Sequence, residues 1–243
     1  MNKEIINYIS EHFKNTGCNL LVIGPGRSQI ISSIISEINL IGIDMIDHNS
    51  DALVFQKSLL SSYSGKTNFI DCELTKEFPA TIVNNKYDLI LCTEVIEHVK
   101  NNGNLIDHIN KLLKSSGICM ISVPNGFIDK LLLKIDKGYM RNGDLIKGHV
   151  NFYSRKQFRR LLNFHKFEII KFKGISSEYS IFHLILVLFK IHIDEDTGQI
   201  REINRPSVKW GARIMRIMDK TKINLLFNYI IPRNYFAIVK QLR

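Results

Sequence analysis

Short apolar runs alternate with stretches of helical periodicity through the first half of the chain, and this alternation constrains the fold most strongly. Apolar residues recur at spacings of three and four over residues 30–38 and 105–113, as on one face of an amphipathic helix. We expect the second helix to end at Gly117, because glycine is common after helix C-termini. The apolar runs predict strands at residues 20–23, 40–43, 68–70, 87–92 and 118–123.

Strands that alternate with helices form a parallel sheet with helices on both faces. A capping-box pattern at Ser154 and Gln157 predicts a further helix to residue 164, followed by strands at residues 168–172 and 235–239. The expected fold class is therefore α/β, a Rossmann-like doubly wound sheet that is mostly parallel with an antiparallel last strand. Residues 1–243 are interpreted as a single domain.

Two segments interrupt this alternation. Residues 125–151 follow the fifth predicted strand and carry several Lys, Arg and Gly residues, so we interpret them as an active-site loop. Residues 177–234 separate the last two predicted strands and are interpreted as a helical insertion that caps the site.

Cysteine usage and the N-terminus indicate a reducing compartment. The cysteines are widely spaced and form no CxxC pair, which is typical of buried thiols. The N-terminus lacks the continuous apolar core of a signal peptide. The longest apolar stretch, residues 179–193, is shorter than the ~20 residues that span a bilayer. We expect a cytoplasmic protein without a transmembrane helix. The cysteines are Cys18, Cys72, Cys92 and Cys119.

The positive charge of the chain is concentrated in its second half. The formal net charge is +10, with −3 on residues 1–125 and +13 on residues 126–243. This asymmetry favours an anionic partner, which could be a membrane surface, nucleic acid or a phosphorylated substrate. Nucleic acid is the less favoured partner, because the sequence contains no recognisable RNA-binding module or zinc knuckle.

The first predicted strand runs into GPGRS at residues 24–28 and then directly into a helix. Such a turn lets the backbone approach a ligand and directs the helix N-terminus at it. Gln29 replaces the third glycine of the dinucleotide-binding pattern, which disfavours NAD. The next strand is expected to end in Asp44, whose carboxylate could accept both hydroxyls of a ribose. Asp47 is the alternative ribose ligand. The structural alternative is a tight turn beside a solvated aspartate.

Over about residues 1–175 the sequence resembles the class I S-adenosylmethionine-dependent methyltransferases, in particular the ubiquinone-pathway O-methyltransferases. Six stretches carry the resemblance, in order and at appropriate spacing. The resemblance implies an enzyme with S-adenosyl-L-methionine as its cofactor. The stretches are LLVIGPGRS, IGID, NFIDCEL, YDLILCTEVIEHV, LLKSSGICMISVPN and HVNFYSRKQFRRLLNFHKFEIIKFKG.

The resemblance also implies roles for individual residues. The glycine turn would face the methionine part of the cofactor, and Asp44 would hold its ribose. Met45 would flank the adenine, Asp71 would accept from the adenine amino group, and the Cys72 backbone would serve the ring. The implied cofactor-binding residues are Gly24, Pro25, Gly26, Ser28, Asp44, Met45, Asp71, Cys72, Thr93 and Glu94.

The sequence departs from the family pattern at two positions. Val22 stands where an acidic residue is usual, and Ser28 stands where a third glycine is usual. We expect weaker cofactor binding, because a water-bridged contact to the cofactor amine would be missing. These departures leave open a catalytically silent, cofactor-binding or membrane-associated protein.

A candidate metal site follows the fourth predicted strand. Glu94, Glu97 and His98 are spaced i, i+3 and i+4, so a short helix would put them on one face. With His149 they could hold Mg²⁺, Mn²⁺ or Zn²⁺. The pattern resembles the metal motif of ubiquinone-pathway and small-RNA 2′-O-methyltransferases, in which the ion would lower the pKa of the acceptor hydroxyl. Alternatively, as in metal-free relatives, the glutamate caps a helix and the histidine packs locally.

Without a metal, His149 or His98 could act as a general base, because imidazole titrates near neutral pH. His149 could instead only close its loop onto the sheet. Residues 92–95 do not match the N/DPPY motif of amine methylation. We therefore expect O-methylation of a small-molecule, glycan or lipid-like hydroxyl, with RNA 2′-O-methylation as the alternative.

Cationic residues recur at spacings of four, three and four near the C-terminus, opposite Trp210, Ile214 and Ile217. This basic amphipathic pattern is typical of a helix in a membrane interface, which would give peripheral contact with an anionic membrane such as the inner membrane surface. We favour the interpretation that the helix forms part of a cap over the substrate pocket. Both could hold at once, with a lipid-linked acceptor entering between the cap and the membrane. The cationic residues are Lys209, Arg213, Arg216 and Lys220.

Overall fold

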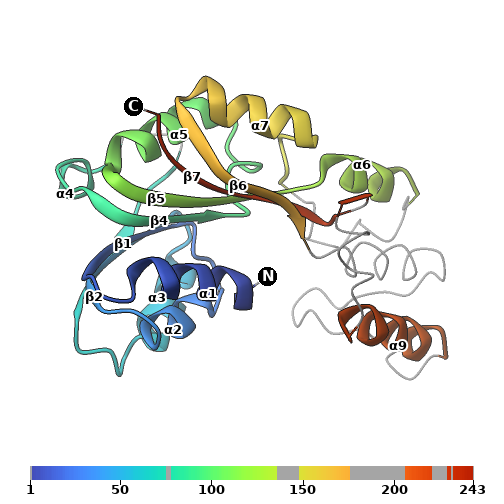
Figure 1. The fold of residues 1–243 in the computed structure, drawn as a ribbon, viewed down its shortest axis with the longest axis horizontal. Helices are drawn as coiled ribbons and strands as arrows, with labels where there is room; N and C mark the ends of the chain where they lie inside the picture. The colour runs from blue at the N-terminus through green and yellow to red at the C-terminus, as the bar shows by residue number, and fades with distance from the viewer. Residues whose placement is uncertain are drawn as a thin grey trace. The chain divides into compact units, whose positions relative to one another are not determined.

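The computed structural model of this chain describes residues 2–74, 78–135, 148–175, 206–220, 229–230 and 232–242. Within them, seven strands form one sheet in the order β3-β2-β1-β4-β5-β7-β6 (Figure 1). The strands are β1 (Cys18–Ile23), β2 (Leu40–Asp47), β3 (Lys66–Asp71), β4 (Tyr87–Thr93), β5 (Leu113–Pro124), β6 (Phe167–Ile175) and β7 (Asn234–Gln241).

The strand order confirms the predicted fold class. β1 pairs in parallel with β2 and β4, β2 pairs in parallel with β3, and β4 pairs in parallel with β5. The sheet is mixed, with its last strands antiparallel. The strand order reverses direction between β1 and β4, and this is the switch point beside which doubly wound proteins bind their ligands.

The helices of the described residues connect these strands. Figure 1 places α1, α2 and α3 on one face of the sheet and α5 on the other. The predicted capping box is present, because Ser154 N donates to Gln157 Oε1 at 2.9 Å and Gln157 N donates to Ser154 Oγ at 3.3 Å. The helices are α1 (Asn2–Phe13), α2 (Ile30–Ile35), α3 (Ser50–Leu59), α4 (Ala80–Val83), α5 (Asn102–Leu112), α6 (Gly126–Ile135), α7 (Arg155–Phe164) and α9 (Pro206–Lys220).

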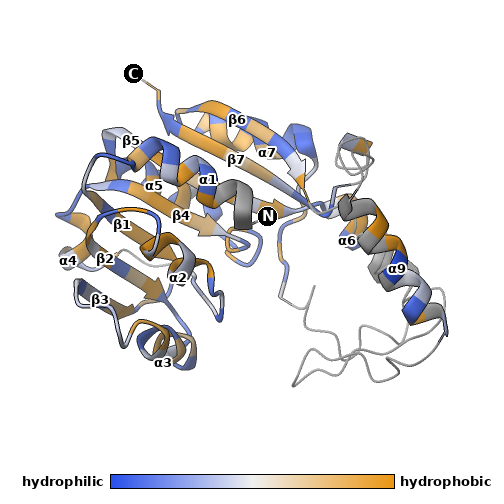
Figure 2. Ribbon diagram, turned by 60° about the horizontal axis from the view of Figure 1, so that its bottom comes forward, coloured by the Kyte–Doolittle hydropathy of each residue, from blue (hydrophilic) through white to orange (hydrophobic). Residues whose placement is uncertain are grey.

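The chain divides into two compact units. The first comprises Met1–Ser122, Arg159–Lys171 and Ala237–Arg243, and the second comprises Val123–Phe158 and Phe172–Phe236. The central strands β1 and β4 of the first unit are hydrophobic along most of their length (Figure 2). Parallel strands covered on both faces need such runs, and these strands form the core. Leu20, Leu21, Ile23, Leu89 and Ile90 are at most 1% exposed.

Backbone hydrogen bonds join distant segments within the second unit. Asn125 N donates to the Arg233 carbonyl at 2.8 Å, and Arg233 N donates to the Ile175 carbonyl at 3.0 Å. Gly126 N donates to the Tyr153 carbonyl at 3.0 Å. A Cβ at position 126 would lie 2.7 Å from the Tyr153 nitrogen, so this close approach requires glycine. The start of α6, the end of β6 and the start of β7 therefore meet.

Two boundary predictions are wrong. β2 continues to Asp47 instead of ending at Asp44. α5 ends at Leu112, and Gly117 lies inside β5, where a Cβ would approach the Tyr87 carbonyl oxygen to 2.8 Å. The predicted loop 125–151 begins with helix α6, while its residues 136–147 lie outside the described part. Of the predicted insertion 177–234, the structure describes residues 206–220, 229–230 and 232–234.

Helix α9 carries the basic pattern recognised in the sequence. Val208 is buried at 2% exposure, whereas Trp210 is 58% exposed and Ile217 is 51% exposed. Lys209 and Arg213 are also exposed. The side chains of Arg216 and Lys220 lie outside those that the structure describes. No helix in the described ranges has the length and hydropathy needed to cross a bilayer.

The buried thiols predicted from the sequence are confirmed for three of the four cysteines. Cys18, Cys92 and Cys119 are buried, Cys72 is partly exposed, and none of these four described cysteines forms a disulfide. Burial, together with the Asp88 charge, raises the pKa of Cys18 to about 12, although Lys114 acts in the opposite direction. Burial also raises the pKa of the Cys92 and Cys119 thiols. These groups are therefore poor nucleophiles in the folded protein.

We expect iodoacetamide to alkylate Cys72 in the native protein and to spare the three buried cysteines. Full unfolding in urea should expose all four thiols to the reagent. Peptide mass spectrometry of labelled samples measures the modification at each site. Native labelling of Cys92 at the rate of Cys72 would contradict the described packing.

Candidate functional site

The turn between β1 and α2 has the backbone geometry that its glycines allow. Gly24 has φ +60° and donates its amide proton to the Ile46 carbonyl at 2.8 Å. A Cβ at position 24 would lie 2.5 Å from Val95 Cγ2, so the turn packs against the residues that follow β4. Gly24 therefore satisfies two constraints, a left-handed backbone and a close contact.

Gly26 lies at the open part of the same turn. Its φ is +52°, and a Cβ built on it would meet no atom within 4 Å. Its amide donates to Asp47 Oδ2 at 3.0 Å. Pro25 is buried, and its carbonyl accepts from Ser28 N at 3.1 Å. Open space beside an exposed backbone is what close approach of a ligand requires.

Gln56 of α3 braces this turn from inside the protein. Its Nε2 donates to the Gly26 carbonyl at 2.9 Å and to the Ser28 carbonyl at 2.8 Å, and the residue is 0% exposed. Sequence reasoning missed Gln56. The signal was available, because a glutamine shares the buried face of α3 with Ala52 and Leu53 and so needs partners there.

The structure does not put Asp44 at the strand end. Its Oδ1 accepts from Asn68 Nδ2 at 2.6 Å, and its Oδ2 accepts from the Tyr87 hydroxyl at 2.5 Å and from Asn85 Nδ2 at 3.4 Å. Burial and the hydrogen bond to Asp44 raise the pKa of Tyr87. Asp44 therefore belongs to a polar network inside the sheet, which corrects its expected position.

Asp47 is the carboxylate at the C-terminal end of β2. Besides the Gly26 amide, it accepts from Asn49 N at 2.9 Å through Oδ1, and its backbone carbonyl accepts from Cys72 N at 3.0 Å. His48 follows it, with Nδ1 at 3.4 Å from Asp47 Oδ1 and a side chain that is 72% exposed. A carboxylate offers about four acceptor positions, so these bonds leave capacity for further donors.

Three other residues are expected near an adenine ring. Met45 lies inside a strand, whereas Asp71 and Cys72 lie at a strand end. Met45 is 0% exposed within β2, so its position does not suit contact with a ligand at the strand ends. Asp71 ends β3, pairs in register with Asp47, and accepts from Ser50 Oγ at 2.6 Å. Cys72 follows it directly.

Thr93 and Glu94 lie at the end of β4, as the sequence predicts. Glu94 has φ +57°, a conformation that is uncommon for a residue other than glycine and that often marks functional sites. Its Oε1 accepts from Ser122 Oγ at 2.7 Å, and its amide donates to the Ser122 carbonyl at 3.2 Å. β5 therefore fixes the strained residue.

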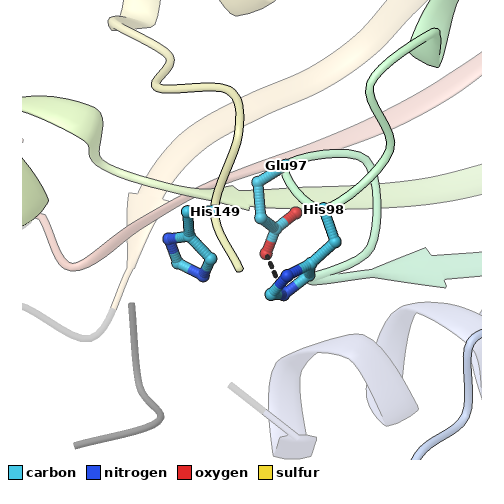
Figure 3. A group of neighbouring side chains, drawn as sticks. All are labelled: Glu97, His98 and His149. Carbon is cyan, nitrogen blue, oxygen red and sulfur yellow. Dashed lines mark ion pairs between the residues drawn. The ribbon is translucent and has the colours of Figure 1, made fainter. Parts of the chain in front are cut away.

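Glu97 and His98 follow the same strand end, and Figure 3 draws them with the ion pair between His98 Nε2 and Glu97 Oε1 at 3.9 Å. Glu97 is 1% exposed, and His98 is exposed. Among the described residues, one possible ligand atom each of Glu97, His98 and His149 lie within 4.8 Å of one another. Glu94 is not a member of this group.

His149 belongs to the second unit, where it contacts Asp129, which also pairs with Arg233. His149 Nδ1 lies 3.1 Å from Asp129 Oδ2, and Arg233 Nη1 pairs with the other oxygen of the same carboxylate. The side chains of Asp129 and His149 are 1% and 4% exposed. Sequence reasoning singled out His149 but missed both partners.

Residues 2–171 match a family model that is described as a methyltransferase domain. This range covers more than half of the chain. The chain belongs to this methyltransferase family. The strand order and the residues that gather at the ends of β1, β2 and β4 agree with this membership.

A curated relative of this chain is the ubiquinone biosynthesis O-methyltransferase of Rickettsia bellii (strain OSU 85-389). The two are 29% identical over 127 residues, which cover 49% of this chain and 50% of the relative. The chain spans about half the length of the curated relatives that it matches.

Solved structures share the fold of this chain. The plantazolicin methyltransferase BpumL in complex with SAH has a TM-score of 0.57 at 17% identity, covering 100% of this chain and 82% of that chain. The [4+2]-cyclase SpnF has a TM-score of 0.60 at 16% identity, covering 98% and 81%. At such identities the likeness shows the fold alone, and a fold does not determine the reaction.

Proposed function

We propose that this protein transfers a methyl group from S-adenosyl-L-methionine to a hydroxyl group of a small-molecule, glycan or lipid-like acceptor. The observation that carries the proposal is the glycine turn with φ > 0 whose Gly26 amide binds the carboxylate that ends the neighbouring strand. Family membership and the relatives named as O-methyltransferases support it.

In this proposal Asp47, rather than Asp44, binds the ribose of the cofactor. Asp47 ends β2 beside the turn, whereas the Asp44 carboxylate already accepts from three side chains. Asp71 and the Cys72 backbone keep their expected roles toward the adenine, and the exposed His48 takes the place assigned to Met45. Gly24, Gly26, Thr93 and Glu94 serve the methionine part.

The cofactor supplies an electrophilic methyl group on a positively charged sulfur. The acceptor oxygen attacks the methyl carbon, a carbon–oxygen bond forms, and the carbon–sulfur bond breaks with its electron pair going to sulfur. The hydroxyl proton must leave, and His149 is the base proposed to take it. His98 is the second candidate for the base, because it lies shortly after the end of β4, in the stretch that resembles the family motif.

We further propose that Glu97, His98 and His149 bind a divalent metal ion. The donor set of Glu97, His98 and His149 combines a carboxylate with two imidazoles, which suits Zn²⁺ or Mn²⁺ better than Mg²⁺. Such an ion would act as a Lewis acid and lower the pKa of the acceptor hydroxyl. Glu94 remains a less favoured ligand, since its carboxylate accepts from Ser122.

The substitution Asp47→Asn should weaken binding of S-adenosylhomocysteine about tenfold or more. It removes one acceptor oxygen and the charge, and a charge-assisted hydrogen bond contributes about 1.5–3 kcal/mol. Isothermal titration calorimetry measures the dissociation constant.

The matched control for this experiment is Asp44→Asn. It should leave the dissociation constant unchanged and lower the melting temperature, because its new amide would face the donors Asn68 and Tyr87. The reverse pattern would restore Asp44 as the ribose ligand. Absence of binding by the wild-type protein to both the cofactor and its demethylated product would refute the proposed function.

The metal proposal predicts that the protein, freed of metal by chelation, binds Mn²⁺ or Zn²⁺ in calorimetry. Glu97→Gln and His98→Ala should each lower the affinity tenfold or more, while Asp107→Asn, which alters a different carboxylate–histidine pair, should have no effect. Wild-type protein that binds neither ion would eliminate the metal and leave His149 as the base.

We also propose that α9 contacts anionic membranes. Trp210 and Ile217 are more than half exposed, and Lys209 and Arg213 are exposed beside them, so the helix presents apolar and cationic side chains together. Such a surface suits the headgroup region of a bilayer. The exposure of Trp210 favours this partner over a helix whose apolar face is buried as a cap.

Liposome co-sedimentation tests the membrane proposal. Each cation near an anionic leaflet contributes about 1 kcal/mol, so Lys209→Glu with Arg213→Glu should lower pelleting at least tenfold. Lys57→Glu with Lys66→Glu, an equal change of charge elsewhere, is the control. Emission of Trp210, the single tryptophan, should shift to the blue on binding. Equal pelleting with anionic and neutral vesicles at low salt would contradict the proposal.

A further inference from the structure

The proposed base, His149, contacts a buried ion pair between Asp129 and Arg233. Asp129 lies in the first turn of α6 and is 1% exposed. Arg233 is the residue immediately before β7, and its side chain is 10% exposed. Arg233 Nη1 pairs with Asp129 Oδ1, and Asp129 Oδ2 lies 3.1 Å from His149 Nδ1. One carboxylate therefore bridges a guanidinium and an imidazole, and all three groups belong to the second unit.

Asn125 joins the backbone segments that carry Asp129 and Arg233. Its Oδ1 accepts from Phe127 N at 3.1 Å at the start of α6, and its carbonyl accepts from Asp129 N at 3.1 Å. Its Nδ2 donates to the Pro232 carbonyl at 2.9 Å, and its backbone amide donates to the Arg233 carbonyl at 2.8 Å. The carboxylate is therefore held from both segments, although they are more than one hundred residues apart in sequence.

The ion pair determines where a neutral His149 carries its proton. The guanidinium of arginine can only donate, and a carboxylate paired with it can only accept. The Asp129 oxygen that faces His149 must then receive a proton from Nδ1. Because neutral imidazole has one N–H, the lone pair lies on Nε2.

We propose that Asp129 and Arg233 are positioning residues, which hold His149 as its Nδ1–H tautomer and present Nε2 as the acceptor nitrogen. The inference rests on the proposed function, because a base that takes the acceptor proton and a ligand of a metal both need this lone pair. A carboxylate that accepts from one ring nitrogen of a histidine fixes the orientation and the tautomer of the ring in both settings.

The substitution Asp129→Asn separates this role from that of a structural ion pair. The amide has one oxygen and one NH₂ group, and Arg233 can pair only with the oxygen. The NH₂ group then faces His149 Nδ1, which must accept, so the proton moves to Nε2. A carboxylate that only joined α6 to the segment before β7 would have no such effect on the imidazole.

Nitrogen NMR of ¹⁵N-histidine-labelled full-length protein reports the tautomer directly, at a pH where the imidazoles are neutral. His149→Gln identifies the His149 signals by their loss. The wild type should show the Nδ1–H pattern, and Asp129→Asn should show the Nε2–H pattern. Asp107→Asn is the matched control, because Asp107 contacts His165 Nδ1 at 2.6 Å; it should change only the His165 signals.

A wild-type His149 with its proton on Nε2 overturns the inference, and this result needs no variant to fold. An unchanged tautomer in a folded Asp129→Asn protein also overturns it. Calorimetry with S-adenosylhomocysteine on the same samples distinguishes failure of the proposed function from failure of the positioning role. A protein that does not bind the ligand refutes the proposed function. A wrong tautomer with intact binding refutes only the positioning role.

Discussion

The hydrogen bond from the Gly26 amide to the Asp47 carboxylate joins the ends of two adjacent parallel strands, and the remaining site depends on it. It requires a left-handed residue at position 26, which glycine adopts without strain. It also requires β2 to extend to Asp47. Gln56 supports the turn from below through two carbonyl groups, and Gly24 keeps the turn against Val95. The chain thereby gathers backbone donors and a carboxylate at the switch point of the sheet.

The fold was predictable because its signals are local. Short apolar runs between amphipathic stretches marked β1 to β5, and the Ser154–Gln157 capping box marked α7. The error at Asp44 arose because a charged residue inside an apolar run was taken for the strand end. The sequence contained the opposing signal: Asn49 caps α3 by accepting from Asp51 N and Ala52 N, so the strand has to end shortly before it.

The partners of His149 were beyond sequence reasoning. Asp129 and Arg233 are separated by most of the second half of the chain, and neither belongs to a recognisable motif. Only the topology, which inserts β7 between β5 and β6, brings the segment before β7 to the start of α6. Glu94 is a similar case, because a sequence shows the residue but not its φ of +57° or its bond to Ser122.

The central claim is that the carboxylate at the end of β2 receives the cofactor. A crystal structure of the protein with S-adenosylhomocysteine tests it most directly, through the distances from the ribose hydroxyl oxygens to the carboxylates of Asp47 and Asp44. The account predicts both hydroxyls within about 3.0 Å of Asp47 Oδ1 and Oδ2, the range of a hydrogen bond between oxygens, with Asp44 still bound to Tyr87. A ribose held by Asp44, or by neither aspartate, would contradict it.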